Sequence, residues 1–221
     1  SDPSRGLGDV YKRQVLTITH NGYIKRTSLS TYRSQRRGGR GVQGASSREE
    51  DFVEHLFVAN THSYILFFTD KGKCYWVKVY DIPEGGRAAK GRAIVNLIGC
   101  EPDEKVSAFI SVKEFNEDHY VVMATEKGMV KKTKLSAYSN PRKKGIYAVE
   151  IRDGDKLIEA RVSTGDNDIL LGTRNGKSIR FSEEQIRASG RKTMGVKGIT
   201  LSSEDDRLVG MLLIKREGTV L

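Results

Sequence analysis

A repeated succession of apolar and polar positions runs along the chain from residue 15 onward. An apolar stretch at residues 15–19 runs into Asn21-Gly22, and a second stretch that carries basic residues follows at 23–26. Such stretches joined by Asn-Gly predict a tight β-hairpin, because the turn needs residues that accept a positive φ. The pattern therefore begins with a pair of antiparallel strands.

The hairpin pattern recurs at a period that is typical of a repeat architecture. After each hairpin a basic loop ends in a further glycine and a short strand, and an acidic turn then leads to a last strand. About four short strands per unit, at a period of roughly 40 to 55 residues, predict an all-β, propeller-like array with one unit per blade. The hairpin glycines are Gly22, Gly72, Gly128, Gly176 and Gly218, and the loop glycines are Gly41, Gly91, Gly145 and Gly198.

These landmarks divide the chain into a leader and a single β domain. Residues 1–14 match no repeat and resemble translated adapter sequence, so we expect a non-native leader before a domain at 15–221. The predicted repeats are residues 15–63, 64–118, 119–167 and 168–210, with the start of a fifth at 211–221. A short helical turn is expected at 183–188, and no longer stretch has helical periodicity. We therefore predict an open array of about four blades.

Charge follows the same period as the strands. The first long loop of each repeat is basic and nearly free of carboxylates, and the second is acidic. Stacked repeats place equivalent loops at equivalent positions, so the basic loops are expected to form one continuous belt. The acidic turns, with pairs such as Asp205-Asp206, are interpreted as solvated charge that lies elsewhere. The basic loops contain Arg33, Arg36, Arg37 and Arg40, then Arg87, Lys90 and Arg92, then Arg142, Lys143 and Lys144, then Arg187, Arg191, Lys192 and Lys197.

Composition narrows the classes of function. The chain has 221 residues, 37% of them hydrophobic, so it can bury a core, which argues against a disordered protein. Its net charge of +10 permits nucleic acid or an anionic membrane as a partner. No apolar run is long enough for a membrane-spanning helix, and we expect no membrane partner. Two cysteines, Cys74 and Cys100, show no metal-ligand spacing, and we predict a cytoplasmic protein.

Residues 35–41 combine three arginines with three glycines and read Gln-Arg-Arg-Gly-Gly-Arg-Gly. Guanidinium groups stay in water unless they are paired, so this stretch is predicted to be a surface loop. Glycine lets a ligand approach the backbone, and arginine presents a planar fork that fits phosphate oxygens. The stretch suits a polyanion, and taken alone it is equally compatible with a solvated basic turn.

A curved positive belt suits duplex DNA that bends around a protein. Bending 20 to 30 base pairs through 40 to 90° costs on the order of 1 to 6 kcal/mol, so the contacts must recur along the arc. The sequence contains no evident recognition helix or set of stacking aromatics that would read bases. We therefore expect sequence-tolerant wrapping of DNA through phosphate contacts, with a steep dependence on salt.

Residues 35–41 also resemble, at every position, the Gln-Arg-Arg-Gly-Gly-Lys/Arg-Gly box of the C-terminal domain of the DNA gyrase A subunit. Further stretches are similar to that domain in repeat order, among them residues 49–53, 58–62, 78–83, 91–97, 128–133 and 195–199. The resemblance implies a β-pinwheel, a disc of six blades in which neighbouring blades exchange strands and DNA wraps on the basic outer rim. This chain covers about four of the six repeats.

The resemblance also implies a context for the domain. In the parent A2B2 enzyme, a type II topoisomerase, chiral wrapping supports ATP-dependent negative supercoiling. The implied partners are double-stranded DNA, the rest of the gyrase A subunit and the gyrase B subunit. ATP and Mg²⁺ would be used by other parts of that enzyme, so no cofactor, metal site or catalytic residue is expected in this fragment.

The resemblance and the charge pattern together name the candidate DNA-binding residues. By the resemblance, the arginines of the box hold the phosphate backbone, its glycines allow close approach, and Gln35 positions the loop. The candidate residues are Lys25, Arg26, Arg33, Gln35, Arg36, Arg37, Gly38, Gly39, Arg40, Gly41, Arg87, Lys90, Arg92, Lys131, Lys132, Arg142, Lys143, Lys144, Arg191, Lys192 and Lys197.

Other functions fit parts of the same pattern. A propeller that binds an acidic protein could use the same belt, and it would leave DNA topology unchanged. A topoisomerase IV-type C-terminal domain would have a similar fold, although the intact box disfavours it. An enzyme is disfavoured, because the four histidines His20, His55, His62 and His119 show neither ligand spacing nor catalytic spacing.

Overall fold

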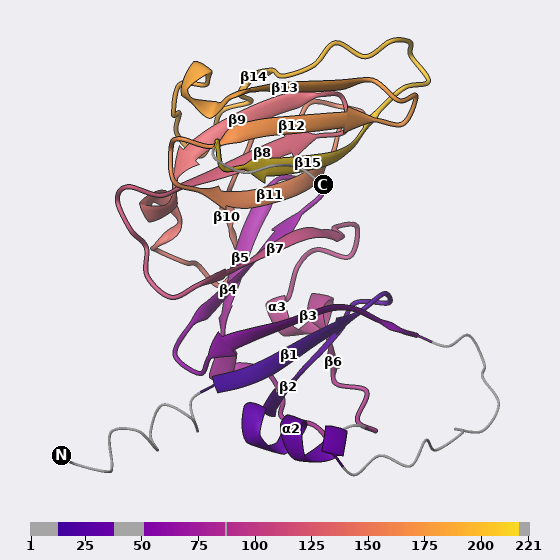
Figure 1. The fold of residues 1–221 in the computed structure, drawn as a ribbon, viewed down its shortest axis with the longest axis vertical. Helices are drawn as coiled ribbons and strands as arrows, with labels where there is room; N and C mark the ends of the chain where they lie inside the picture. The colour runs from indigo at the N-terminus through magenta and orange to yellow at the C-terminus, as the bar shows by residue number, and fades with distance from the viewer. Residues whose placement is uncertain (1–12, 38–50, 87, 217–221) are drawn as a thin grey trace. The chain divides into compact units, whose positions relative to one another are not determined.

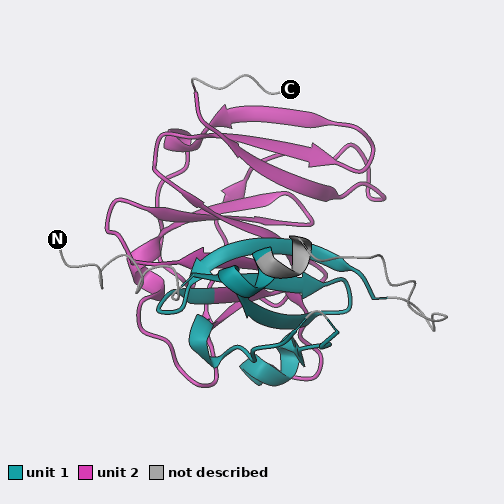
Figure 2. Ribbon diagram, turned by 60° about the horizontal axis from the view of Figure 1, so that its bottom comes forward, with its two compact units in different colours: residues 1–65, 77–99 teal, residues 66–76, 100–221 magenta. Residues whose placement is uncertain are grey.

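The computed structural model describes residues 13–37, 51–86 and 88–216, with only the backbone described at 34–37. It divides into two compact units, residues 1–65 with 77–99 and residues 66–76 with 100–221 (Figure 2). Apart from two short helices in the first unit and a few 3-10 turns, the described residues form antiparallel strands and connecting turns (Figure 1). This confirms the all-β prediction, and each unit is described separately below.

The first unit is built on the hairpin predicted at residues 15–26. Strands β1 (Arg13–Thr19) and β2 (Tyr23–Ser28) pair antiparallel on either side of Gly22, which has φ +81°. Strand β3 (Val53–Asn60) pairs with β1, and the two-residue strand β6 (Arg92–Ala93) pairs with β2, in the order β3-β1-β2-β6. The unit also contains the 3-10 turn η1 (Val79–Asp81) and, after β6, the short helix α3 (Ile94–Ile98).

A second helix in this unit corrects the prediction of a loop for residues 35–37, the described part of the stretch at 35–41. Helix α2 spans Leu29–Arg37, so Gln35, Arg36 and Arg37 form its last turn. Ser28 precedes the helix, and its Oγ accepts a hydrogen bond from Thr31 N at 3.3 Å, as a helix-capping serine does. Residues 29–37 contain no glycine or proline and several good helix formers, and this local signal was outweighed by the glycines that follow.

The second unit contains three sheets (Figure 1). Their orders are β10-β5-β4-β7, β11-β8-β9-β14 and β13-β12-β15, each built around a hairpin. The 3-10 turns η2 (Leu135–Tyr138) and η3 (Glu183–Gln185) follow two of these hairpins, and η3 lies where the sequence predicts a helical turn. The strands are β4 (Tyr64–Thr69), β5 (Lys73–Lys78), β7 (Val106–Val112), β8 (Tyr120–Thr125), β9 (Met129–Lys134), β10 (Ile146–Tyr147), β11 (Leu157–Ser163), β12 (Asp168–Thr173), β13 (Ser178–Ser182), β14 (Val196–Lys197) and β15 (Leu208–Ile214).

The sheets of the second unit pack face to face. Strand β8 is apolar on both faces, and its residues alternate between two cores. Val121 and Met123 pack in one core with residues of the first sheet such as Phe68, whereas Val122 and Ala124 pack in a second core with Leu171 of β12. A strand buried on both faces reads as a continuous apolar run, which is what residues 120–124 show.

Short strands are exchanged between consecutive repeats. Strand β10 follows the third hairpin in sequence but pairs with β5 of the second, and β14 follows the fourth hairpin but pairs with β9 of the third. Strand β6 has the same relation to β2 in the first unit. This confirms the exchange that the resemblance implies.

The exchanged strands show that the loop glycine of the fourth repeat differs from the one predicted. The glycine that opens β14 is Gly195, whereas the sequence suggested Gly198. Gly195 has φ +81°, as Gly91 and Gly145 do before β6 and β10, at +85° and +77°. Its position relative to Gly176 is then the same as that of Gly91 relative to Gly72, so the repeat is more regular than the sequence suggested.

The last described strand differs from the predicted start of a fifth repeat at residue 211. Met211 lies within β15 and pairs with Leu171 of β12. Residues 211–214 therefore complete the fourth sheet, in the place that β11 holds in the third. The apolar run at 211–214 looks like the first strand of a hairpin, and periodicity alone cannot distinguish the two strands.

The acidic turns have a structural role that the sequence did not reveal. Asp206 is buried, and its Oδ1 accepts hydrogen bonds from Asn175 N at 3.0 Å and Arg207 N at 2.9 Å. Asp155 and Asp51 accept from the equivalent turn amides Lys127 N and Asn21 N, each at 2.9 Å. One carboxylate of each of these turns thus fastens a hairpin, and the interpretation as solvated charge is wrong for these residues.

We expect Gly195→Ala to lower the free energy of unfolding by about 2 kcal/mol or more, because a side chain at positive φ costs about 1 to 3 kcal/mol. The added Cβ would also overlap Val130 O. Gly190→Ala in the same loop is the control, since its Cβ would meet nothing within 4 Å. Urea unfolding of both variants measures the difference, and equal stabilities would contradict the assigned backbone contact.

We expect Asp206→Asn to destabilise the protein at pH 7, with an effect that fades in acid. Burial alone raises the pKa of Asp206, but hydrogen bonds from Asn175 N, Ser202 Oγ and other donors outweigh it and hold the pKa at about 2. The stabilisation is present above about pH 4, the unfolded value, and is lost as the pH falls towards 2. Unfolding curves against pH measure it. The exposed neighbour Asp205→Asn is the control and should show little change.

Candidate nucleic-acid interface

The basic loops of the second unit run along one edge of its sheets. Strands β7, β11 and β15, which end their repeats, lie against one another. The opposite edges are formed by the second hairpin strands β5 and β9, on which β10 and β14 pair. Each basic loop leads into one of these exchanged strands, so the loops at 139–145 and 183–195 must follow the edges remote from β7, β11 and β15.

The later of these loops contacts the strand and chain that directly follow the earlier one. Arg191 Nη1 of the later loop donates a hydrogen bond to Tyr147 O at 3.1 Å, and Glu150 N donates to Thr193 O at 3.0 Å. The ammonium of Lys192 lies 5.5 Å from the centre of the Tyr147 ring. Tyr147 is only two residues beyond Gly145, where the earlier loop ends. The later basic loop thus lies next to the segment in which the earlier one ends, and a continuous belt of basic loops stays a prediction.

Most of the described candidate side chains in the loops are exposed. Arg191 is half-buried because it also supports Tyr147. In the first unit the ammonium of Lys90 lies 4.2 Å from the centre of the Tyr23 ring. The exposed candidates are Arg33, Lys90, Arg92, Arg142, Lys143, Lys144, Lys192 and Lys197.

Two candidates on β9 are not at the surface, which corrects their prediction as DNA contacts. Lys131 is 1% exposed, and its Nζ donates to Ala148 O and to Arg191 O, each at 2.6 Å. Lys132 is 6% exposed, and its Nζ donates to Glu183 O at 3.2 Å. The exchange of strands covers β9 at these positions, and a single hairpin gives no sign of that cover.

Two candidates of the first unit also serve internal contacts. Lys25 Nζ donates to Gly86 O at 2.8 Å and to Ala89 O at 2.9 Å. Arg26 Nε donates to Ile82 O at 2.7 Å, and Nη1 donates to Gln14 Oε1 at 3.1 Å. Both side chains are half-buried. These cations hold the chain rather than standing free on the surface.

The rest of the candidate set is outside what the structure describes. Gly38, Gly39, Arg40, Gly41 and Arg87 lie outside the described residues, and for Gln35, Arg36 and Arg37 only the backbone is described. Their role in DNA binding stays a prediction.

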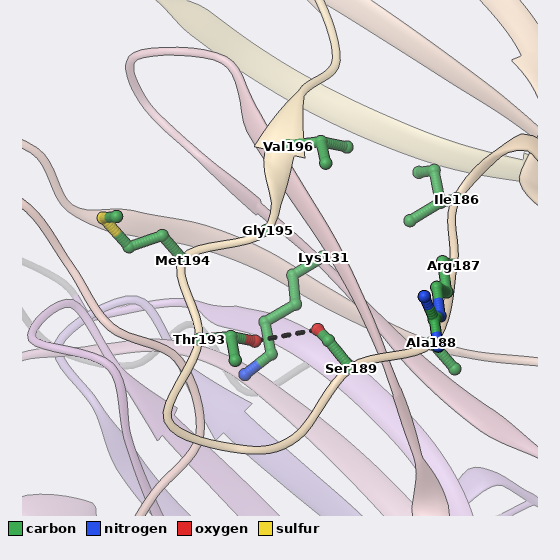
Figure 3. Close-up of a pocket in the computed structure, with 9 residues that line it drawn as sticks. All are labelled: Lys131, Ile186, Arg187, Ala188, Ser189, Thr193, Met194, Gly195 and Val196. Atoms are coloured by element: carbon green, nitrogen blue, oxygen red, sulfur yellow. Dashed lines mark hydrogen bonds between the residues drawn. The ribbon is translucent and has the colours of Figure 1, made fainter.

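A hollow of about 500 Å³ lies beside the loop of the fourth repeat (Figure 3). The side chain of Lys131 reaches into the loop, close to the Ser189 and Thr193 hydroxyls, which share a hydrogen bond of 2.8 Å. Burial, with a smaller effect of the Arg191 charge, lowers the pKa of Lys131 to about 7. The residues that line the hollow are Lys131, Ile186, Arg187, Ala188, Ser189, Thr193, Met194, Gly195 and Val196.

The described part of the chain has neither a metal-binding cluster nor a membrane-spanning helix. At 13–37, 51–86 and 88–216, no group of three or more His, Cys, Asp or Glu side chains could hold a metal ion. Within those same ranges, no helix has the length and apolar character needed to cross a membrane. Basic loops on the sheet edges are thus the main chemical feature of the described surface.

The four sheets coincide with matches to a known family. Residues 13–60, 63–113, 119–164 and 167–215 match the family described as DNA gyrase C-terminal domain, beta-propeller. The chain belongs to this family. The fourth match extends to residue 215, which agrees with β15 as the last strand of the fourth repeat.

Relatives of this DNA gyrase C-terminal domain protein are gyrase A subunits. The DNA gyrase A subunit of Halalkalibacterium halodurans is 52% identical over 194 residues, which are 87% of this chain and 23% of that protein. The DNA gyrase A subunit of Salmonella typhimurium is 45% identical over 207 residues, which are 94% of this chain and 24% of that protein. The chain thus spans about a quarter of the length of these relatives.

Solved structures share the fold of this gyrase C-terminal domain. The C-terminal domain of DNA topoisomerase IV superposes with a TM-score of 0.78 at 30% identity, over 93% of this chain and 62% of that chain. A DNA gyrase A C-terminal domain superposes with a TM-score of 0.68 at 23% identity, over 92% of this chain and 65% of that chain. Both confirm the predicted propeller-like pinwheel architecture.

Proposed function

We propose that this chain binds duplex DNA along its basic loops and wraps it chirally. The observation that carries the proposal is that the basic loop at 183–195 contacts Tyr147 of β10, the strand into which the basic loop at 139–145 leads. Together the two loops expose Arg142, Lys143, Lys144 and Lys192, with Lys197 on the adjoining strand β14. Neighbouring positive loops on successive sheets supply the recurrent phosphate contacts that a bent duplex needs.

The proposed binding is through the phosphate backbone. The exposed groups are lysine and arginine side chains on loops, which fix the path of a duplex without reading its bases. Each neutralised phosphate releases counterions, so affinity falls steeply as salt rises. Binding should therefore tolerate any sequence and depend strongly on ionic strength.

The wider role is also a proposal, supported by the family and by its gyrase A relatives. The wrapped DNA is expected to be presented to the rest of the gyrase A subunit and to the gyrase B subunit in an A2B2 enzyme of the cytoplasm, where it supports ATP-dependent negative supercoiling. The reaction itself, with ATP and Mg²⁺, belongs to other parts of that type II topoisomerase. This chain then contributes the binding surface and no catalytic group.

The most detailed part of the proposal concerns the individual residues at 35–41. Arg36, Arg37 and Arg40 are proposed to hold the phosphate backbone, with Gly38, Gly39 and Gly41 allowing close approach. Helix α2 places Arg36 and Arg37 at its C-terminal end, directly before the glycines. The backbone of the first three residues of this stretch is thus helical, and the glycines follow it directly in the sequence.

Two alternatives lead to different outcomes in the same experiments. A module for an acidic protein partner would bind DNA without changing its linking number. A topoisomerase IV-type domain has the same architecture, as the superposition shows, and the intact box at 35–41 is the feature that favours the gyrase type.

Charge reversal tests the proposed contact surface. We expect Lys143→Glu with Lys144→Glu to weaken DNA binding equally for unrelated sequences, and to reduce the slope of log affinity against log salt by about 2, since each phosphate contact contributes about 0.9. The control is Lys105→Glu with Lys113→Glu, which makes the same change in net charge at exposed sites outside the basic loops. A loss confined to one DNA sequence, or an equal loss in the control, would contradict the proposal.

Ligation of nicked circular DNA in the presence of the protein tests wrapping itself. We expect a linking-number change that grows with protein concentration. Arg36→Ala with Arg37→Ala and Arg40→Ala should reduce this change more than it reduces binding, because the other basic loops remain. Binding without any linking-number change in the unmodified protein would favour the acidic-partner alternative.

A further inference from the structure

One position in each of the first three hairpins touches the basic loop of the following repeat. It is the third residue after the hairpin glycine, which is Lys25 in the first repeat, Tyr75 in the second and Lys131 in the third. The loop glycines Gly91, Gly145 and Gly195 lie against these side chains, with an added Cβ at 3.1, 2.7 and 2.9 Å from Lys25 Cβ, Tyr75 Cε1 and Lys131 Cβ. The three residues occupy equivalent places, which we call the loop seat.

At the loop seat of the third repeat, Lys131 binds backbone carbonyl groups. Its Nζ donates to Arg191 O in the loop and to Ala148 O just beyond β10, each at 2.6 Å. An irregular loop lacks a ladder of backbone bonds, so a buried donor such as Lys131 satisfies the Arg191 carbonyl. Ala148 O also accepts from the Tyr138 hydroxyl at 3.1 Å. One side chain thereby joins the loop of the fourth repeat to the chain just after the exchanged strand of the third.

The hydrogen bond between Lys131 and the loop fixes the backbone that carries Arg191 and Lys192. The carbonyl of Arg191 points inward to Lys131, while its guanidinium reaches Tyr147 O. The next residue, Lys192, places its ammonium over the exposed ring of Tyr147. A hollow lies beside the loop (Figure 3), which is also held by Ser189 N, donating to Lys132 O at 2.8 Å.

The first repeat has the same arrangement with its own residues. Lys25 Nζ donates to Gly86 O and Ala89 O, directly before Lys90, whose ammonium lies over the Tyr23 ring. In the second repeat the seat is aromatic, because the Tyr75 ring packs under Gly145 and its hydroxyl donates to Glu104 Oε2 at 2.8 Å. The loop seat therefore has the same position in all three repeats, but its side chain is a lysine in two of them and a tyrosine in the other.

We propose that Lys131 is a positioning residue for DNA binding, which acts by fixing the loop at 187–195 so that Arg191 and Lys192 face the duplex, and which does not touch DNA itself. This inference rests on the proposed function of the basic loops. It gives the buried lysine of β9 a part in binding that differs from the direct contact expected from sequence.

The test compares two lysines of the same strand. Lys131→Met and Lys134→Met each replace one lysine of β9 by an uncharged side chain of similar length, and Lys134 is exposed at the end of the strand. We expect Lys131→Met to weaken DNA binding about five- to ten-fold, the loss of one or two phosphate contacts, and Lys134→Met to weaken it less than about two-fold at the same salt concentration. Equal effects of the two variants would overturn the proposal.

A second measurement separates positioning from contact. In a background of Arg191→Ala with Lys192→Ala, Lys131→Met should cause no further loss of affinity, because the groups that it positions are gone. Additive losses would show that Lys131 contacts DNA directly, and would overturn the proposal. Hydrogen exchange at residues 188–195 should be faster in Lys131→Met than in Lys134→Met, and unchanged exchange would contradict the loop-seat role.

The equivalent lysine of the first unit covers the case in which Lys131→Met fails to fold. Lys25 is only half-buried, and Lys25→Met with exchange measured at residues 86–91 tests the same device against the exposed control Lys113→Met. Should the unmodified chain show no salt-dependent DNA binding, the proposed function would fail. The exchange difference would still report on the loop seat, so the two failures are distinguishable.

Discussion

The pairing of a two-residue strand with the sheet of the preceding repeat is the constraint on which the rest of the structure depends. Strands β10 and β14 each begin after a glycine at positive φ. Gly195 lies so close to Val130 O that no other residue fits without strain. Because the chain must leave its own hairpin and reach the edge of the previous one, the segment between them is drawn along that edge. The basic loops occupy this segment, so strand exchange and the placement of positive charge have the same cause.

Strand exchange also divides the cations into two classes. Lysines on the second hairpin strand, such as Lys131 and Lys132, become covered by the arriving loop and donate to its carbonyl groups. Lysines and arginines within the arriving loop, such as Lys143 and Lys192, stay in water. The net charge of +10 is therefore larger than the charge available to bind a ligand, because some of the lysines that contribute to it are buried against the loops.

The sequence predicts what depends on short-range pattern. The hairpins, their period and the alternation of basic and acidic segments follow from turn residues and from apolar runs, and the structure has them. What it does not predict depends on contacts between repeats. The burial of Lys131, the choice of Gly195 over Gly198 and the membership of Met211 in β15 are all decided by a neighbouring repeat. Helix α2 could have been predicted locally, because Ser28 is a helix-capping residue directly before it. The glycines that follow the helix favoured a loop instead.

The acidic turns place negative charge away from the basic loops. Asp155 and Asp206 direct their negative charge to the amides of hairpin turns, Lys127 N and Asn175 N. Those turns lie at the start of the second hairpin strands, apart from the basic loops. The two carboxylates in the loop at 183–195 are engaged as well, since Glu183 accepts from Asn167 N at 2.9 Å and Glu184 from Arg216 Nη2 at 3.0 Å. A carboxylate in the loop at 139–145 would neutralise a proposed phosphate contact, whereas one that fastens a turn stabilises the same sheet whose edge carries the cations. The acidic segments therefore serve folding and leave the basic segments free for the proposed ligand, which explains why charge is sorted by position in the repeat.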